Sequence, residues 1–222
     1  MAIKPRPSRP GAGRRTRSHA PNTDQLRRQI AADAARIMAE EGVNNFQAAK
    51  RKAALRLGLP ETKHLPGNEE IEAALQEHLR LFHAGRLSQS LPRFRTLAAE
   101  AMRFLSRFEP RLVGPILSGT VTASTAIELH ITADTPEEVG FWLQEHSIPY
   151  EQGDRRLRFG GDRYETFPAY RFTADGVAVE LCVFSRHAAR EAPLSPVDGK
   201  PMKRANLREV ENLANGMNGP GA

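Results

Sequence analysis

Apolar residues recur at helical spacing through the first half of the chain. From Asn22 to Glu41 they return every three or four residues, and Gly42 follows as a stop signal. The same spacing predicts three more helices, over Asn45–Leu57, from Asn68 to Phe82 and over Pro92–Phe108. Asn68 is expected to cap the third of the four helices, because an asparagine side chain accepts hydrogen bonds from the free N–H groups of a first turn.

After Glu109-Pro110 the apolar pattern changes to the short period of strands. We expect strands at Arg111–Ser118, Thr125–Thr132, Pro149–Phe159, Glu165–Thr173 and Val177–Phe184, and helices at Thr135–His146 and Asn206–Leu213. Turn signals at Gly160-Gly161-Asp162 and Asp175-Gly176 predict that the last three strands form hairpins. A run of helices followed by a mixed sheet crossed by one helix is typical of the α+β class.

This order divides the chain into four parts. A basic tail covers residues 1–21, a helical extension 22–91, an α+β domain 92–200, and a short C-terminal helix with a flexible tail 201–222. Proline, glycine, serine and arginine dominate the first part. Because such a composition buries too little apolar surface to fold, we expect residues 1–21 to be disordered.

The excess of positive charge belongs to the same tail. The formal net charge is +6, and residues 1–18 contain six Lys or Arg and no Asp or Glu. The remaining chain is therefore balanced. A tail of this kind binds RNA or DNA phosphates weakly and in a salt-dependent way. The alternative is a solvated leader without a partner.

The cysteine content and the hydropathy bound the location of the protein. Cys182 is the only cysteine, which excludes an intrachain disulfide and a cysteine-rich zinc site and favours a reducing compartment. No apolar run reaches the length of a membrane span or resembles the core of a signal peptide. We expect a soluble cytoplasmic protein without a membrane partner.

Candidate chemistry lies on two predicted strands. Side chains alternate between the faces of a strand, so Glu128 and His130 share the face opposite Ile127, Leu129 and Ile131. The last strand repeats the pattern, with Glu180 and Cys182 on its more polar side. If the two strands are neighbours and bury their apolar sides against the same helices, the two glutamates and the histidine converge.

With the upstream Gly119-Thr120 pair, these residues resemble the nucleotidyltransferase superfamily typified by DNA polymerase β, over about residues 94–185. The motif of that family is a glycine with serine or glycine after an apolar strand, then a strand with two acids separated by one residue, then a third acid on a later strand. Gly119-Thr120, Glu128-Leu129-His130 and Glu180 occupy these three places.

The resemblance implies a reaction and a cofactor. The reaction is transfer of a nucleotidyl group from an NTP to a hydroxyl on RNA, protein or a small molecule, with Mg²⁺ or Mn²⁺. Clustered carboxylates hold such cations, which in turn hold the triphosphate. The resemblance assigns catalysis and metal binding to Glu128, His130 and Glu180, and phosphate contacts to Gly119 and Thr120.

Arginines on the predicted hairpin are further phosphate candidates, because a guanidinium binds phosphate through paired hydrogen bonds. Arg156 and Arg158 are the two we assign to this role, from a cluster that also contains Arg155, Arg163 and Arg171. The alternative is a charged, exposed strand face that Asp154, Asp162 and Glu165 neutralise.

The chain departs from the family pattern in three ways. His130 stands where the family has an acid, and imidazole suits Mn²⁺ or Zn²⁺ better than Mg²⁺. Glu128 and Glu180 stand where Asp is more common, and only seven residues separate Thr120 from Glu128. These departures predict a degenerate transferase site. The alternatives are a non-catalytic nucleic-acid-binding or regulatory module that keeps the fold, or simply the wet face of an antiparallel sheet.

Overall fold

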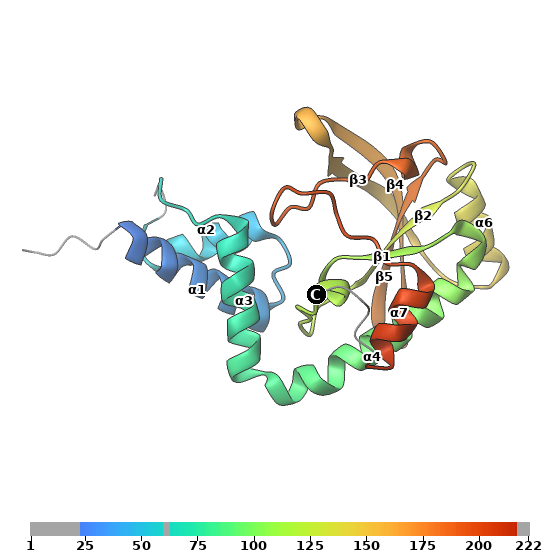
Figure 1. Ribbon diagram of the computed structural model, residues 1–222. Coiled ribbons are helices and arrows are strands. Elements are labelled where there is room, and N and C mark those ends of the chain that lie inside the picture. The colour runs from blue at the N-terminus through green and yellow to red at the C-terminus, as the bar shows by residue number, and fades with distance from the viewer. Residues whose placement is uncertain (1–22, 60–62, 217–222) are drawn as a thin grey trace, which may run out of the picture.

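The computed structural model describes residues 23–59 and 63–216, and all side chains within these ranges except those of residues 86–88. A helical part comes first, and a five-stranded mixed sheet with helices packed on it follows (Figure 1). The α+β class expected from the sequence is confirmed. The expected disorder and nucleic-acid binding of residues 1–21 lie outside the described residues. None of the described helices has the length and apolar character needed to cross a membrane.

Three helices form a core of their own in the first part. They are α1 (Thr23–Glu41), α2 (Phe46–Arg56) and α3 (Asn68–Phe82), and their buried residues include Ile30, Ile37, Ala49, Ala53, Ile71 and Leu75. Asn45 caps α2, because its side chain accepts from the N–H of Ala48 at 3.0 Å. The expected cap of α3 is wrong by one residue. Gly67 is the N-cap, and the Asn68 amide instead donates to the carbonyl of Pro196.

Helix α4 (Ala84–Phe104) leads from the helical part to the sheet and differs from the predicted helix over Pro92–Phe108. Pro92 lies inside the helix. It removes one backbone hydrogen bond because proline has no N–H, but the helix continues on both sides of it. At the other end, Phe108 belongs to a separate 3-10 turn, η1 (Ser106–Phe108). The second half of α4 packs Ala98 and Met102 into the core beneath the sheet, and Leu105 joins that core from the C-cap position. The helix therefore continues through the proline.

The sheet has the strand order β1-β2-β5-β4-β3. Its strands are β1 (Arg111–Val113), β2 (Ile127–Thr132), β3 (Glu151–Arg158), β4 (Tyr164–Ala174) and β5 (Val177–Phe184). Strands β2 and β5 are parallel, and the other neighbours are antiparallel. The prediction that the strands carrying Glu128 and Glu180 lie side by side is confirmed, as are the hairpins β3–β4 and β4–β5.

The predicted strand Arg111–Ser118 is wrong beyond Val113. Gly114 has a φ of 73° and a ψ of −154°, a conformation that residues with a side chain rarely adopt. A Cβ atom at Gly114 would also lie 3.1 Å from the carboxyl carbon of Glu128. Pro115 then opens the short helix α5 (Pro115–Ser118), since its fixed φ suits the first position of a helix. Gly119-Thr120 therefore follows a helical turn instead of joining two strands.

Helices cover one face of the sheet. Apolar side chains on this helix-covered face are buried against α4, α6 (Glu137–Glu145) and α7 (Leu207–Ala214), and include Ile127, Leu129, Ile131, Val179, Leu181 and Val183. This is the apolar face that the strand alternation predicts. The opposite face carries Glu128, His130, Glu180 and Cys182, and we call it the polar face.

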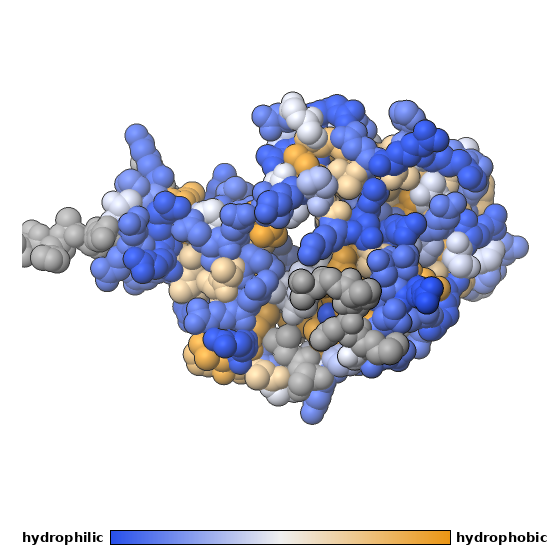
Figure 2. Space-filling view, viewed as in Figure 1, coloured by the Kyte–Doolittle hydropathy of each residue, from blue (hydrophilic) through white to orange (hydrophobic). Residues whose placement is uncertain are grey.

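Among the described residues, hydrogen bonds between three residue pairs join the helical part to the sheet part. The Asn44 amide donates to the carbonyl of Ser124 at 3.1 Å and accepts from its hydroxyl at 3.2 Å. The Thr120 hydroxyl donates to Glu72 of α3 at 2.9 Å, and Asn68 reaches Pro196. The space-filling view shows a hollow between the two parts and a surface dominated by hydrophilic residues (Figure 2). The two parts therefore meet through polar bonds and through α4, and each part keeps its own core.

Candidate functional site

Glu128 and Glu180 are brought together by strand pairing. They are register partners on the parallel strands β2 and β5, so their side chains leave the polar face next to each other. Their side chains are 24% and 29% exposed. Two carboxylates this close repel each other unless a cation or a proton lies between them.

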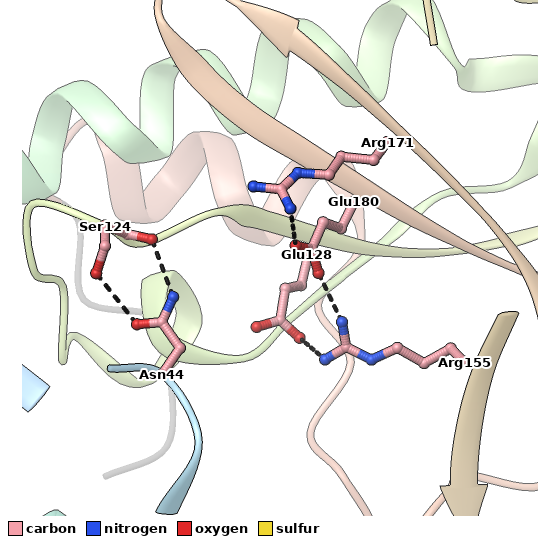
Figure 3. A network of polar contacts seen from close by, with 6 residues as sticks. All are labelled: Asn44, Ser124, Glu128, Arg155, Arg171 and Glu180. Atoms are coloured by element: carbon pink, nitrogen blue, oxygen red, sulfur yellow. Dashed lines mark hydrogen bonds and ion pairs between the residues drawn. The ribbon is translucent and has the colours of Figure 1, made fainter. Parts of the chain in front are cut away.

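A single arginine from the far edge of the sheet supplies that cation. Arg155 on β3 donates from Nη1 to Glu180 Oε2 at 2.6 Å and from Nη2 to Glu128 Oε2 at 3.0 Å (Figure 3). Arg171 on β4 adds a longer ion pair to Glu180 at 4.0 Å. Burial lowers the pKa of Arg155, but the two carboxylates outweigh burial, and the pKa is raised overall. The arginine is therefore firmly charged.

The carboxyl group of Glu128 has a raised pKa. Burial raises its pKa above the ordinary value for a glutamate, the charge of Arg155 opposes that rise, and the nearby Glu180 adds to it. The raised pKa means that Glu128 gains from any additional positive charge brought to the polar face.

His130 and Cys182 lie next to the glutamates and are buried. Each is only 6% exposed, so the expectation of a wet sheet face is wrong at this point. The His130 ring lies 4.7 Å from the ring of Phe184, and its Nδ1 atom has no hydrogen-bond partner. Burial, together with the charges of Arg204 and Arg155, lowers the pKa of His130 to about 3. The imidazole is therefore neutral at physiological pH.

The Cys182 side chain packs against apolar neighbours. It joins Phe159, Phe167 and Phe184 in a small apolar cluster at the hairpin end of the polar face. Burial raises the pKa of its thiol to about 12. Since the thiolate is the reactive form, Cys182 is not a nucleophile at neutral pH.

A pocket of about 250 Å³ opens over the carboxylates. Among the residues that line it are Glu128, Glu180, Arg155, Arg171, His130 and Met202. Both signs of charge are thus present in one concave site, together with an apolar wall. Such a combination suits a ligand that carries phosphate groups and a bound cation.

The expected phosphate contacts are not part of this pocket. The Thr120 hydroxyl bonds to Ser118 and Glu72, next to Gly119 and on the side of the helical part. Arg156 stacks on the ring of Tyr164 at 4.4 Å, and Arg158 lies 3.9 Å from Asp162. None of these four residues lines the site that contains Glu128 and Glu180.

The structure instead brings Arg155 and Arg171 to the carboxylates. Both belong to the arginine cluster seen in the sequence, whereas the prediction assigns phosphate binding to Arg156 and Arg158. Strand alternation separates the two sets. Arg155 is the register partner of Phe167, and Arg171 is the register partner of Glu180, so both side chains lie on the polar face. Gly114 leaves room for the Glu128 carboxylate. Apart from being a glycine, it carries no feature in the sequence that predicts this role.

Glu128 and Glu180 offer two oxygen ligands of the kind that Mg²⁺ and Mn²⁺ take. The full set predicted from the sequence is not assembled. In residues 23–59 and 63–216, no group of three or more His, Cys, Asp or Glu side chains is arranged to hold a metal ion. The position between the two carboxylates belongs to the Arg155 guanidinium.

No protein-family model matches the chain, and a search of curated proteins gives no match.

Proposed function

We propose that the polar face binds a nucleoside triphosphate together with a divalent cation and transfers its nucleotidyl group to a hydroxyl. The observation that carries this proposal is the register pairing of Glu128 with Glu180 on neighbouring parallel strands, inside a pocket that also holds two arginines. The acceptor is a hydroxyl on RNA, protein or a small molecule. Its oxygen bonds to the α-phosphorus, its proton is released, and pyrophosphate leaves.

The side chains of the site divide into two roles. Glu128 and Glu180 would hold the cation, which neutralises phosphate charge and orients the triphosphate. Arg155 would exchange its two carboxylates for phosphate oxygens, and Arg171 lies close enough to Glu180 to follow the same path. Arg155 therefore acts as a stand-in cation in the free protein and as a phosphate ligand in the complex.

Metal binding is the first test. Mn²⁺ is titrated into the wild type and into Glu128→Gln and Glu180→Gln, with binding followed by calorimetry. The wild type should bind Mn²⁺, and each substitution should weaken binding by at least about tenfold. Glu211→Gln is the matched control, because Glu211 also pairs with an arginine, Arg103, but on the helix-covered side. No Mn²⁺ binding at millimolar concentration in the wild type would exclude the cation from the proposal.

Label transfer is the second test. The wild type is incubated with NTPs labelled at the α-phosphate, Mg²⁺ or Mn²⁺, and total RNA or total protein. Label on an acceptor that disappears in Glu180→Gln supports the transferase. The proposal includes a cytoplasmic location, favoured by the single cysteine, and contact with RNA or DNA through the basic tail.

The second candidate is a non-catalytic binding or regulatory module. It is favoured by one observation, the Arg155 bridge, which satisfies both carboxylates without any metal. For this candidate, nucleotide or RNA binds, no label is transferred, and Glu128→Gln leaves ligand affinity unchanged. The two experiments above therefore separate the candidates.

A further inference from the structure

A second pocket of about 250 Å³ lies beside the first and shares His130 with it. The residues that line the second pocket are Glu109, Arg111, His130, Ile131, Thr132, Phe184, Ala189 and Arg204. Thr132 and Phe184 are the last residues of the parallel strands β2 and β5. Open sheets with parallel strands bind ligands outside the carboxyl ends of those strands. The position alone makes this pocket a candidate binding site.

Two arginines converge on this pocket for separate structural reasons. Arg111 opens β1 and is the direct cross-strand partner of His130, so the two side chains share the polar face. Arg204 arrives from the C-terminal loop, because Ala205 exchanges two backbone hydrogen bonds of 2.9 Å with Leu112 and holds the loop against β1. Its guanidinium donates to the carbonyl of Ala189 at 2.9 Å. Arg204 is therefore fixed in place.

The two arginines of the pocket form no ion pair inside the described part of the chain. No ion pair within 4.0 Å joins Arg111 or Arg204 to a carboxylate there, although most arginines of the hairpin have such a partner. Burial and the nearby Arg111 lower the pKa of Arg204. Two neighbouring cations that form no ion pair cost free energy in the free protein and attract an anion, although Glu109 also lines the pocket.

We infer that the pocket of Arg111, Arg204 and His130 binds a phosphate group. Two guanidinium groups match the tetrahedral oxygens of phosphate, and Thr132 and His130 add polar residues to the lining. The pocket volume of about 250 Å³ is sufficient for a phosphate group. The inference goes beyond the proposed function, because it uses neither Glu128 nor Glu180 and requires no metal.

The experiment titrates inorganic phosphate into the full chain in EDTA, at an ionic strength fixed with chloride, by calorimetry or ³¹P NMR. Phosphate should bind the wild type, and Arg111→Met and Arg204→Met should each weaken it by about tenfold or more, as expected for a charge-assisted hydrogen bond. Arg103→Met, which removes an arginine from the helix-covered side, should leave the affinity unchanged. Glu109→Gln removes the one carboxylate in the lining and should tighten binding about twofold to fivefold.

Thermal unfolding of each variant verifies that it is folded, and Arg204→Lys replaces Arg204→Met if the latter unfolds. Since lysine keeps the charge but loses the planar fork, Arg204→Lys should bind phosphate more weakly than the wild type. Phosphate that binds no better than chloride, or that binds both single variants as tightly as the wild type, overturns the inference.

Competition assigns the source of the phosphate group. Displacement of phosphate by a mononucleotide, but not by a short single-stranded RNA, assigns the pocket to a small ligand, and the reverse result assigns it to a nucleic-acid backbone. Phosphate binding without Mn²⁺ binding would remove the proposed function alone, and Mn²⁺ binding without phosphate binding would remove this inference alone.

Discussion

On the helix-covered face of the sheet, Ile127, Leu129 and Val179 are completely buried against apolar side chains. On the polar face of the same strands, Glu128 and Glu180 face a solvent-accessible pocket, and the neighbouring His130 is buried without a partner for Nδ1. Both faces belong to the same strands, β2 and β5. They differ only in the side chains that the alternation along each strand places on them.

The comparison shows that the two faces differ in what they contribute to stability. Burial of apolar side chains stabilises the fold, by about 1.5–3 kcal/mol for each large side chain. Burial of a carboxylate or an imidazole costs free energy unless hydrogen bonds or charges compensate for it. Arg155 compensates Glu128 and Glu180, whereas the buried Nδ1 of His130 is left without a partner. The polar face is therefore the part of the sheet that a ligand can stabilise.

The largest effect is expected on the helix-covered face. Leu129→Ala should lower the free energy of unfolding by about 2–5 kcal/mol, since it leaves a cavity among fully buried neighbours. Urea denaturation gives this value. On the polar face, Glu128→Gln should change stability much less and should not destabilise the protein at neutral pH, because burial already disfavours the charged form. A larger loss for Glu128→Gln than for Leu129→Ala would reverse the comparison.

A pH-dependent loss of stability should come from His130. Its pKa falls from 6.5 to about 3 in the folded protein, so below pH 6.5 the unfolded chain takes up a proton that the folded chain refuses. Stability is therefore full above pH 6.5 and declines as the pH falls, by about 2 kcal/mol at pH 5. His130→Gln should flatten this part of the curve of unfolding free energy against pH. His146 is an exposed histidine at the end of α6, and His146→Gln should retain the acid sensitivity of the wild type.

Removal of the bridging arginine should have two effects of opposite sign. Arg155→Met leaves Glu128 and Glu180 facing each other without their main cation, which should cost about 1–2 kcal/mol, reduced by solvent screening and by Arg171. The same change frees the carboxylates, so Mn²⁺ affinity should rise. Chemical denaturation and Mn²⁺ titration of one preparation measure both effects. A fall in Mn²⁺ affinity would mean that Arg155 does not compete with the cation.

The smallest effect is expected at the junction with the helical part. Thr120→Val removes the hydrogen bond to Glu72 and should cost about 0.5–1.5 kcal/mol. Phosphate affinity should stay at the wild-type value, because Thr120 lies outside both pockets. Thr120→Ser keeps the hydroxyl and should restore most of the stability. Weaker phosphate binding in Thr120→Val would return Gly119-Thr120 to the role that the resemblance implies.

Most of the fold, and half of the candidate site, could be predicted from the sequence. Strand alternation was enough to place Glu128 and Glu180 on the polar sides of their strands and to bury Leu129 and Val179, because a period of two leaves a side chain no other choice of face. The helices over residues 23–41 and 46–56 follow from equally local rules, namely apolar spacing and the Asn45 cap. These features depend on neighbours in the chain.

Long-range contacts decided the rest. Strand alternation separates Arg155 from Arg156 and Arg158, but whether an arginine reaches the glutamates depends on the register of β3 against β4. The burial of His130 depends on Phe184 and on a loop that returns from residue 205 to β1. The same loop carries Arg204 to Arg111, over a separation that no local pattern spans. The sequence by itself determined which face each strand residue occupies, and the tertiary structure decided which charges meet there, because pairing partners distant in the chain are fixed only when the sheet closes.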